Sequence, residues 1–294
     1  MTYFYYPGCS LEGTAREYDR STRALMDALD QPLVDIPDWT CCGASAAAPV
    51  GRLLSLALPA LNLARVEAAD SGDDASAILV PCSACYLNLK AAAEKTRKNP
   101  DLLARVNAVL AEKNLSFRGW AKPRHLLDVL ATDIGAAAIR EKVAAPFAGL
   151  KVAPYYGCQC LRPYTVFDDP ERPTSMEPLI EAAGATVFPW KMGGRCCGAS
   201  HMNTKPDVGL TLVSSILKDA EGADAIVTVC PMCQMNLEAY QKQAGKKSGA
   251  AFNVTILYLP QLLGMAMGLS GGDVGLELNL SVLSGFREGC RASA

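Results

Sequence analysis

Short apolar runs alternate with longer stretches of helical periodicity along most of this chain. The apolar runs predict short buried strands at residues 3–7, 33–36, 77–80, 152–156, 186–189, 225–229 and 254–259. Apolar positions at helical spacing predict helices near residues 12–29, 49–69, 177–183 and 208–220. Strands that alternate with helices are typical of units built on a parallel sheet, so the pattern predicts an α/β fold.

One uncharged stretch, residues 248–272, is long enough to cross a bilayer. It contains polar residues, a proline and several glycines, and it begins as a predicted strand. We therefore expect buried core or a docking surface there and no membrane span.

Composition narrows the class of protein. Half of the 294 residues are apolar, a fifth are charged and the net charge is −2, which indicates a folded globular chain and no nucleic-acid partner. The chain has 12 cysteines, and no charged segment followed by an apolar one opens it. We therefore expect a reducing, cytoplasmic compartment, where clustered thiols indicate metal or redox chemistry.

The chain is an internal repeat with a period of about 150 residues. YYPGCSLEG (5–13) matches YYGCQCLRP (155–163), IPDWTCCGASAA (36–47) matches FPWKMGGRCCGASHM (188–202), and ASAILVPCSACYLNL (75–89) matches ADAIVTVCPMCQMNL (223–237). The blocks recur in the same order, and proline and glycine mark a seam at residues 140–150. The repeat predicts two domains, residues 1–145 and 146–294.

Each half contains one single cysteine, one adjacent pair and one C-x-x-C motif. The first quintet is Cys9, Cys41, Cys42, Cys82 and Cys85, and the second quintet is Cys158, Cys196, Cys197, Cys230 and Cys233. Every block follows a predicted strand, so we expect the thiols at the carboxyl edge of a sheet, where open α/β sheets place their sites. The second cysteine of each C-x-x-C motif is expected to open a helix, whose positive end favours the thiolate.

Several kinds of site use clustered cysteines. Buried apolar cysteines do not explain five thiols at equivalent strand ends, and disulfides leave one thiol over in each half. Structural zinc uses four thiolates and gains little from an adjacent pair, while a thioredoxin-like motif explains neither the pair nor the repeat. Five thiolates without a repeated carboxylate or histidine favour a centre with several iron atoms, and zinc stays an alternative.

At this point the motifs Cys41-Cys42-Gly43 and Cys196-Cys197-Gly198, each followed by C-x-x-C, resemble the cysteine-rich CCG domain family. With two copies, the chain is similar over almost its entire length to the B subunits of heterodisulfide reductases (HdrB). The resemblance implies an α/β fold of two tandem CCG domains related by a pseudo-twofold axis, each a small parallel sheet flanked by helices.

The resemblance also implies cofactors, partners and a reaction. Each quintet would hold one non-cubane [4Fe-4S] cluster, and the two clusters would face one cavity and reduce a small disulfide, or oxidise thiols in the reverse direction. Electrons would come from an HdrA-like flavin partner through an HdrC-like iron–sulfur partner, because this chain has no glycine-rich nucleotide motif of its own. The alternative is a non-catalytic electron-relay CCG subunit of a dehydrogenase complex.

Two residues after the second CCG motif are candidate catalytic residues. His201 and Lys205 have no counterpart in the first half, and they are expected to donate a proton or hold a substrate anion unless they are ordinary surface or core side chains. The arginines close to the cysteine blocks are candidates for binding a carboxylate or phosphate: Arg52, Arg162 and Arg195.

Three further residues are expected to have no part in the chemistry. Cys160 aligns with Leu11, which predicts a buried bystander, and Cys290 has no counterpart in the first half. His125 lies in an apolar stretch and is expected to be structural.

Overall fold

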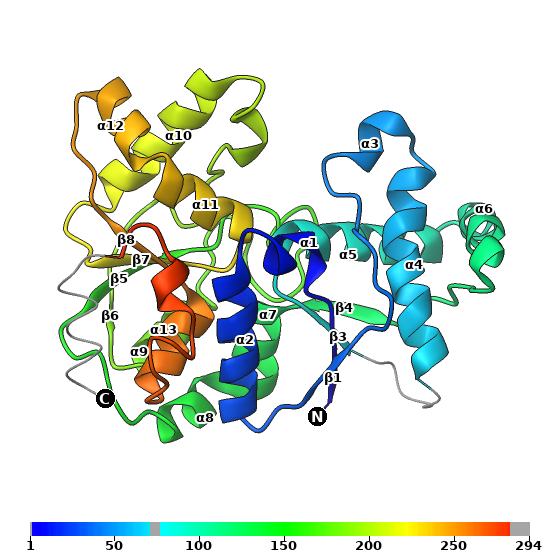
Figure 1. Cartoon of the computed structure of the whole chain (residues 1–294), viewed down its shortest axis with the longest axis horizontal. Helices are drawn as coiled ribbons and strands as arrows, with labels where there is room; N and C mark the ends of the chain where they lie inside the picture. Colours follow the sequence, from blue (N-terminus) through cyan, green and yellow to red (C-terminus); the bar gives the residue numbers. More distant parts are fainter. Residues whose placement is uncertain (1, 71–76, 283–294) are drawn as a thin grey trace. The chain divides into compact units, whose positions relative to one another are not determined.

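The structure, a computed structural model, describes residues 2–70 and 77–282 (Figure 1). The chain divides into two compact units. The first contains Met1–Thr14 and Gln31–Leu126, and the second contains Ala15–Asp30 and Leu127–Ala294. A short segment of the first repeat, Ala15–Asp30, is therefore part of the second unit.

The first unit contains a four-stranded parallel sheet. Its strands are β1 (Tyr3–Tyr5), β2 (Leu33–Asp35), β3 (Ala77–Val80) and β4 (Lys122–His125), in the spatial order β2-β1-β3-β4. In the register, β1 pairs Tyr3 with Leu33 of β2 and Phe4 with Ile78 of β3.

The second unit contains a sheet of the same design. Its strands are β5 (Lys151–Tyr155), β6 (Thr186–Val187), β7 (Ala225–Thr228) and β8 (Thr255–Tyr258), in the spatial order β6-β5-β7-β8. All neighbours are parallel, and β7 pairs Thr228 with Tyr258 at the end of β8. The repeated strand order confirms the predicted α/β fold with two tandem repeats.

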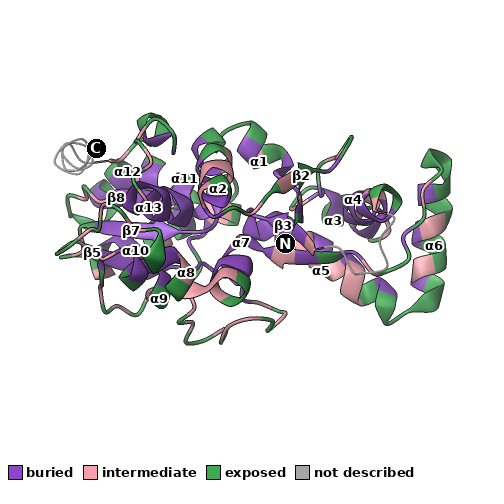
Figure 2. Cartoon of the chain, turned by 90° about the horizontal axis from the view of Figure 1, so that it is seen from below, coloured by how far each residue is buried: buried purple, intermediate pink, exposed green. Residues whose placement is uncertain are grey.

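The strands differ in how far they are buried. The inner strands β3 and β7 are buried along most of their length, as the purple ribbons in Figure 2 show. The apolar run at β2 predicts a buried strand, but β2 is an edge strand and its Val34 is 44% exposed. The sequence pattern does not predict β4, because its residues KPRH are not an apolar run.

Helices connect the strands of the first unit. They are α1 (Gly8–Glu12), α3 (Ala47–Val50), α4 (Leu54–Ala69), α5 (Ser83–Arg97) and α6 (Pro100–Leu110). The helix expected near residues 12–29 is observed as α2 (Arg16–Ala28), which begins later than expected because the chain breaks at Gly13 after α1. The helix expected over residues 49–69 is likewise interrupted at Gly51, between α3 and α4.

The second unit contains most of the remaining helices. They are α8 (Gly135–Glu141), α9 (Glu177–Ala182), α10 (Pro206–Asp219), α11 (Pro231–Ala239), α12 (Gln241–Ser248) and α13 (Leu259–Ala266), preceded by the short α7 (Leu126–Asp128) and a π-helical turn (Val129–Ile134). α9 and α10 lie where the sequence predicts helices.

Helix α2 comes from the first repeat but packs within the second unit against α13 (Figure 1). The Tyr18 ring on α2 stacks on the Tyr258 ring at 4.0 Å between centroids and 5° between planes. Arg20 forms an ion pair with Glu277 at 2.9 Å. Helix α8, also from the first repeat, packs on α9 of the second repeat. Each repeat therefore contributes helices to the packing of the second unit.

The uncharged stretch at residues 248–272 is part of the core. It includes β8 and α13, both of which are buried. Among residues 2–70 and 77–282, no helix combines the length and apolar character that a bilayer crossing needs.

Candidate metal centres

The first unit brings all five cysteines of the first quintet to the carboxyl edge of its sheet. Cys9 lies on α1 just after β1, and the adjacent pair lies in the loop between β2 and α3. Cys82 caps α5, and Cys85 lies in the first turn of that helix. The second cysteine of the motif therefore lies in the first turn of the helix, as expected, and the first cysteine occupies the N-cap. The expected preference for thiolate is wrong for Cys85, because its hydrogen bonds with Cys42 and Cys82 and its burial raise its pKa well above the usual value.

Four of the five sulfur atoms in the first quintet lie in two close pairs. Cys42 Sγ and Cys85 Sγ are 3.3 Å apart, and Cys41 Sγ and Cys9 Sγ are 3.9 Å apart. The hydrogen bond with Cys85 lowers the pKa of Cys42, while burial and the charge of Cys41 raise the pKa of Cys9 to about 11. The thiols of one quintet therefore differ in pKa, and Cys42 becomes a thiolate at lower pH than Cys9 does.

The second unit assembles the second quintet in the same way. Cys158 follows β5, the adjacent pair precedes the 3₁₀ turn Ala199–His201, and Cys230 caps α11 with Cys233 in its first turn. The hydrogen bond from Cys158, with help from the Gly198 N–H and the charges of His201 and Arg162, lowers the pKa of Cys196 to about 5. This quintet therefore has cationic neighbours that favour the thiolate form of Cys196.

A tyrosine supports the backbone before each adjacent pair. Tyr6 donates its hydroxyl hydrogen to the Thr40 carbonyl at 2.6 Å, and Tyr155 donates to the Arg195 carbonyl at 2.7 Å. Thr40 and Arg195 are the residues directly before the two CCG motifs. Sequence reasoning missed these tyrosines, although the repeated YY before each single cysteine is a signal that points to them.

A glycine precedes each single cysteine for a steric reason. Gly8 and Gly157 have φ of +69° and +70°, which favours glycine. A Cβ at Gly8 would lie 2.9 Å from Cys85 Sγ, and one at Gly157 would lie 3.0 Å from Cys233 Sγ. Glycine thus leaves room for the sulfur of the C-x-x-C motif.

The glycine of each CCG motif donates a hydrogen bond to a cysteine sulfur. The Gly43 N–H donates to Cys41 Sγ at 3.4 Å, and the Gly198 N–H donates to Cys196 Sγ at 3.3 Å. An N–H that donates to a sulfur stabilises the thiolate, so both quintets have the same hydrogen bond that favours a negatively charged sulfur.

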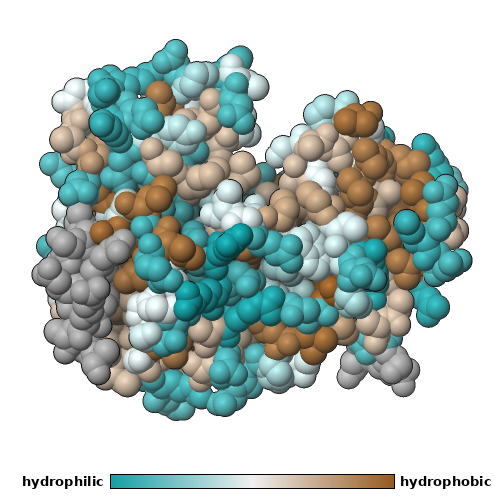
Figure 3. Space-filling view, viewed as in Figure 1, coloured by the Kyte–Doolittle hydropathy of each residue, from teal (hydrophilic) through white to brown (hydrophobic). Residues whose placement is uncertain are grey.

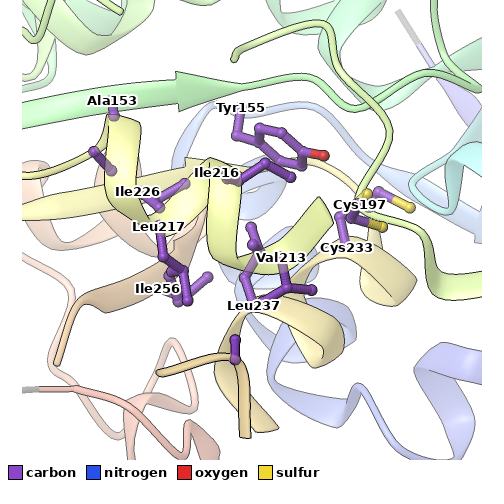
Figure 4. Packing of buried hydrophobic residues seen from close by; sticks show 13 residues of the cluster. Ala153, Tyr155, Cys197, Val213, Ile216, Leu217, Ile226, Cys233, Leu237 and Ile256 are labelled. Carbon is purple, nitrogen blue, oxygen red and sulfur yellow. The ribbon is translucent and has the colours of Figure 1, made fainter. Parts of the chain in front are cut away.

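The second quintet is continuous with the hydrophobic core. Cys197, Cys230 and Cys233 belong to a buried cluster with Tyr155, Val213 and other apolar side chains. In Figure 4 the Cys197 and Cys233 side chains lie together at one end of this cluster, with the Tyr155 hydroxyl directed toward that end. The core thus excludes water from one side of the sulfur group, which strengthens electrostatic effects there.

The donor set fits an iron–sulfur cluster. None of the described cysteines forms a disulfide. Within the described ranges, no three histidine, cysteine or acidic side chains are grouped so that they could hold one metal ion. Five thiols at one sheet edge in each repeat, with an N–H donor directed at one of the sulfurs, match the thiolate ligands and sulfur-directed hydrogen bonds of iron–sulfur proteins.

The two candidate catalytic residues lie on one short segment. His201 ends the 3₁₀ turn after the second CCG motif, and its positive charge helps to lower the pKa of Cys196. Lys205 is the N-cap residue of α10, and its N–H bonds to the His201 carbonyl at 2.7 Å. The structure therefore brings His201 to the second quintet.

The candidate arginines are placed differently. The Arg162 guanidinium donates to the Gly194 carbonyl and pairs with Glu171 at 2.9 Å. Arg195 directly precedes Cys196 and is exposed. Arg52 lines a surface cavity with residues of α6, none of them a cysteine. Arg162 and Arg195 therefore belong to a cysteine block, whereas Arg52 does not.

The remaining predicted bystanders are mostly buried. Cys160 is buried, and its Sγ donates to the Tyr156 carbonyl at 3.2 Å. His125 is buried with its Nε2 3.1 Å from Ser83 Oγ and its ring against Tyr86. Cys290 lies outside the described residues.

The segments after the two CCG motifs differ in character. The segment after the first includes Val50, which is 77% exposed, and leads to Leu54, while hydrophobic surface covers α3 and the start of α4 in Figure 3. The segment after the second carries His201, Asn203 and Lys205 instead. The two quintets therefore share their arrangement of cysteines but differ in the side chains around it.

Known proteins with similar sequences belong to oxidoreductase complexes. The chain is 36% identical to the 8-methylmenaquinol:fumarate reductase membrane anchor subunit of Wolinella succinogenes, over 94% of this chain and 95% of the relative. It is 30% identical to an Archaeoglobus profundus protein named as similar to the B subunit of heterodisulfide reductase, over 91% of each chain. It is 28% identical to the B subunit of the ferredoxin:CoB-CoM heterodisulfide reductase of Methanosarcina mazei, over 92% of this chain and 91% of that one.

A solved structure shares the fold. A hypothetical protein from Helicobacter pylori matches 96% of this chain with a TM-score of 0.75 at 17% identity, and the chain spans about half, 52%, of its length. The profile of the cysteine-rich CCG domain matches twice, at residues 3–90 and 152–238. These two matches contain both quintets, so the chain belongs to the cysteine-rich CCG domain family and carries two copies of the domain.

Proposed function

We propose that this chain is the iron–sulfur catalytic subunit of a heterodisulfide reductase-like complex. The observation that carries the proposal is that both repeats keep a complete quintet with the same supporting hydrogen bonds from tyrosine and glycine. A repeat that had lost its redox role would have no need of these matched contacts. The relatives named as B subunits of heterodisulfide reductases, or as similar to one, support the same assignment.

The ligands follow from the quintets. Each quintet would hold one non-cubane [4Fe-4S] cluster, and a bound cluster supplies single electrons and an iron atom that takes a thiolate sulfur. Reduction of a disulfide consumes two electrons and two protons and yields two thiols. The electrons would enter through an HdrC-like iron–sulfur partner from an HdrA-like flavin partner.

The residues around the second quintet have roles that the geometry supports. His201, whose charge reaches Cys196, would hold a proton for the departing sulfur. Lys205 and Arg162 would attract an anionic group on the substrate. The first quintet lacks such groups in its equivalent segment, where alanine, proline and valine follow the CCG motif.

A second candidate function rests on one observation. The relative at 36% identity is named as the membrane anchor subunit of a fumarate reductase. In that case the chain would pass electrons between partners of a dehydrogenase complex without cleaving a disulfide.

The experiment that separates the two uses anaerobically purified, cluster-loaded protein. Coenzyme M thiol and the coenzyme M–coenzyme B heterodisulfide are added as probes, and EPR spectra are recorded before and after each addition. A catalytic subunit gives a new paramagnetic species with at least one probe, and Cys41→Ser or Cys196→Ser removes it. Spectra that no probe changes, together with cluster reduction by a menaquinol analogue, would overturn disulfide chemistry in favour of the relay.

A further inference from the structure

Two buried carboxyl groups lie together in the second unit. Glu17 on α2 is 6% exposed, and Glu238 on α11 is 8% exposed. Neither forms an ion pair with any residue in the described part of the chain. A buried acid without a cation is costly to ionise, so at least one of the two is held close to its protonated form.

Glu238 and Glu17 differ in their hydrogen-bond donors. The Glu238 carboxylate accepts the Leu280 N–H at 3.2 Å and the Ser281 N–H at 3.3 Å, with the Ser281 hydroxyl at 3.2 Å. For Glu17, the donor is the N–H of its own backbone. Burial and the nearby charge of Glu238 raise the pKa of Glu17 to about 7. Glu17 is therefore the member of the pair that changes its protonation near neutral pH.

The pair is connected to the second quintet. Tyr18, next to Glu17, donates its hydroxyl hydrogen to the Val229 carbonyl at 3.1 Å, and Val229 directly precedes Cys230. Tyr18 stacks on Tyr258, whose pKa is raised by burial and then by the charges of Glu17 and Cys230 among others. Tyr258 thus experiences the charge of the carboxyl and of the ligand sulfur.

Two hydroxyls at this edge have no hydrogen-bond partner among the described residues. They belong to Tyr258 and Thr228, the paired last residues of β8 and β7, and both side chains are fully buried. Buried hydroxyls without partners are rare in folded proteins and call for an explanation. Tyr258 is close enough to the carboxyl pair and to Cys230 for the charges of Glu17, Glu238 and Cys230 to raise its pKa, after the larger effect of burial.

The other charges that face Glu17 leave it uncompensated. Glu238 faces it from α11, and the short turn Leu276–Leu278 brings Glu277, which pairs with Arg20 at the exposed side of α2. Arg16, on the same helix, is exposed, and α13 carries no charged residue. An added negative charge nearby would therefore favour protonation of Glu17.

We propose that Glu17 is the proton acceptor for electron transfer at the second quintet. When the cluster held there gains one electron from its donor, the Glu17 carboxylate takes up one proton from solvent, and it releases that proton when the cluster is oxidised. This role rests on the proposed function in one respect, because a cluster must occupy the second quintet. Glu17 acts through charge and not by contact with the cluster.

The direction of the pH effect follows from the two protonation states. Below about pH 7, Glu17 is protonated whether the cluster is oxidised or reduced, and the reduction potential is independent of pH. Between about pH 7 and the higher pKa that Glu17 has when the cluster is reduced, the oxidised protein has lost the proton and reduction restores it. The potential then falls by about 59 mV for each tenfold fall in proton concentration, the value for one electron with one proton.

The test is a spectroelectrochemical titration of the cluster-loaded chain at several pH values on either side of pH 7, with dithionite as the final reductant. The wild type should show the slope for the second cluster, and Glu17→Gln should abolish it. Asp27→Asn, a change at an exposed position on the same helix, should keep it. A reduction-induced infrared signal of a protonated carboxyl group should appear in the wild type and disappear in Glu17→Gln.

The outcomes separate the two proposals. A wild-type potential that does not change with pH, or a slope that survives in Glu17→Gln, overturns the role of Glu17 while both clusters remain. Folded protein that binds no second cluster overturns the proposed function, and the role of Glu17 with it. If Glu17→Gln does not fold, the wild-type slope and the infrared signal still decide the question.

Discussion

Asn88 and Asn236 make the same hydrogen bond at equivalent places in the two repeats. The Asn88 side-chain amide donates to the Cys42 carbonyl at 3.1 Å, and the Asn236 amide donates to the Cys197 carbonyl at 3.1 Å. Each asparagine lies one helical turn after the last cysteine of its C-x-x-C motif. The bond therefore connects the helix that follows the C-x-x-C motif to the loop that carries the adjacent pair of cysteines.

Loss of this bond should release iron from one repeat only. Asn236→Leu leaves the Cys197 carbonyl without its donor in a buried site, at a cost of about 1–3 kcal/mol. We expect the second quintet to lose its iron faster in the presence of a chelator, and Asn88→Leu to have the same effect on the first. Iron retention over time measures both.

A control for these variants is Asn107→Leu. Asn107 bonds to the backbone of Phe117 at both its amide nitrogen and its oxygen, so its loss destabilises the first unit without touching a quintet. Equal iron loss from Asn107→Leu and Asn88→Leu would contradict a specific role for Asn88.

Gly157→Ala should prevent cluster assembly in the second repeat. Alanine at φ of +70° costs about 1–3 kcal/mol, and the new Cβ would also lie 3.0 Å from Cys233 Sγ. Gly249→Ala has the same φ of +70° but meets nothing within 4 Å, so it has only the backbone cost. Iron content after reconstitution compares the two, and a similar loss in both would show that the sulfur contact has no importance.

Cys160 and Cys158 should behave differently despite their closeness in sequence. Cys160 is buried with its sulfur on the Tyr156 carbonyl, and Leu11 occupies its place in the first repeat. Cys160→Ser should therefore retain the iron of both quintets, whereas Cys158→Ser should lose that of the second. The number of iron atoms per chain decides this. A loss of iron in Cys160→Ser but not in Cys158→Ser would show that Cys160, and not Cys158, binds iron.

In cluster-free protein, Cys196 should be alkylated at lower pH than Cys9. Both are exposed, but the pKa of Cys196 is lowered to about 5 and that of Cys9 is raised to about 11. Cys196 is thus a thiolate at pH 7 and becomes protonated only as the pH falls through about 5, whereas the reactivity of Cys9 keeps rising toward pH 11.

The greater thiolate fraction of Cys196 outweighs its lower intrinsic nucleophilicity, so we expect it to react about tenfold faster than Cys9 at pH 7. Mass spectrometry of peptides after brief iodoacetamide treatment measures the ratio. Denatured protein, in which both rates should become equal, is the control. A faster reaction of Cys9 in folded protein would contradict the assigned environments.

The repeat in the sequence predicted much of the fold and the position of both groups of cysteines. Because the cysteine blocks follow apolar runs, the pattern alone placed both quintets after parallel strands. The same comparison contained Tyr6, Tyr155, Asn88 and Asn236 as matched residues. Their hydrogen bonds were not predictable, because finding the same residue type at matched positions does not show which backbone atom its side chain contacts.

Other features depend on tertiary packing and left no local signal. β4 is a strand because it pairs with β3, although its sequence KPRH has no apolar run. Gly13 ends α1 where periodicity alone suggests a continuous helix. Helix α2 packs in the second unit through Tyr18 and Tyr258, a relation between residues far apart in the chain.

The most direct test of the account is analysis of metal and acid-labile sulfide in anaerobically purified protein, with Cys41→Ser and Cys196→Ser beside the wild type. We predict about eight iron atoms and about eight sulfides per wild-type chain, and about half of each in either variant, because each repeat holds its own four-iron cluster. About two zinc atoms per chain without sulfide, or equal iron in all three proteins, would contradict the central claim.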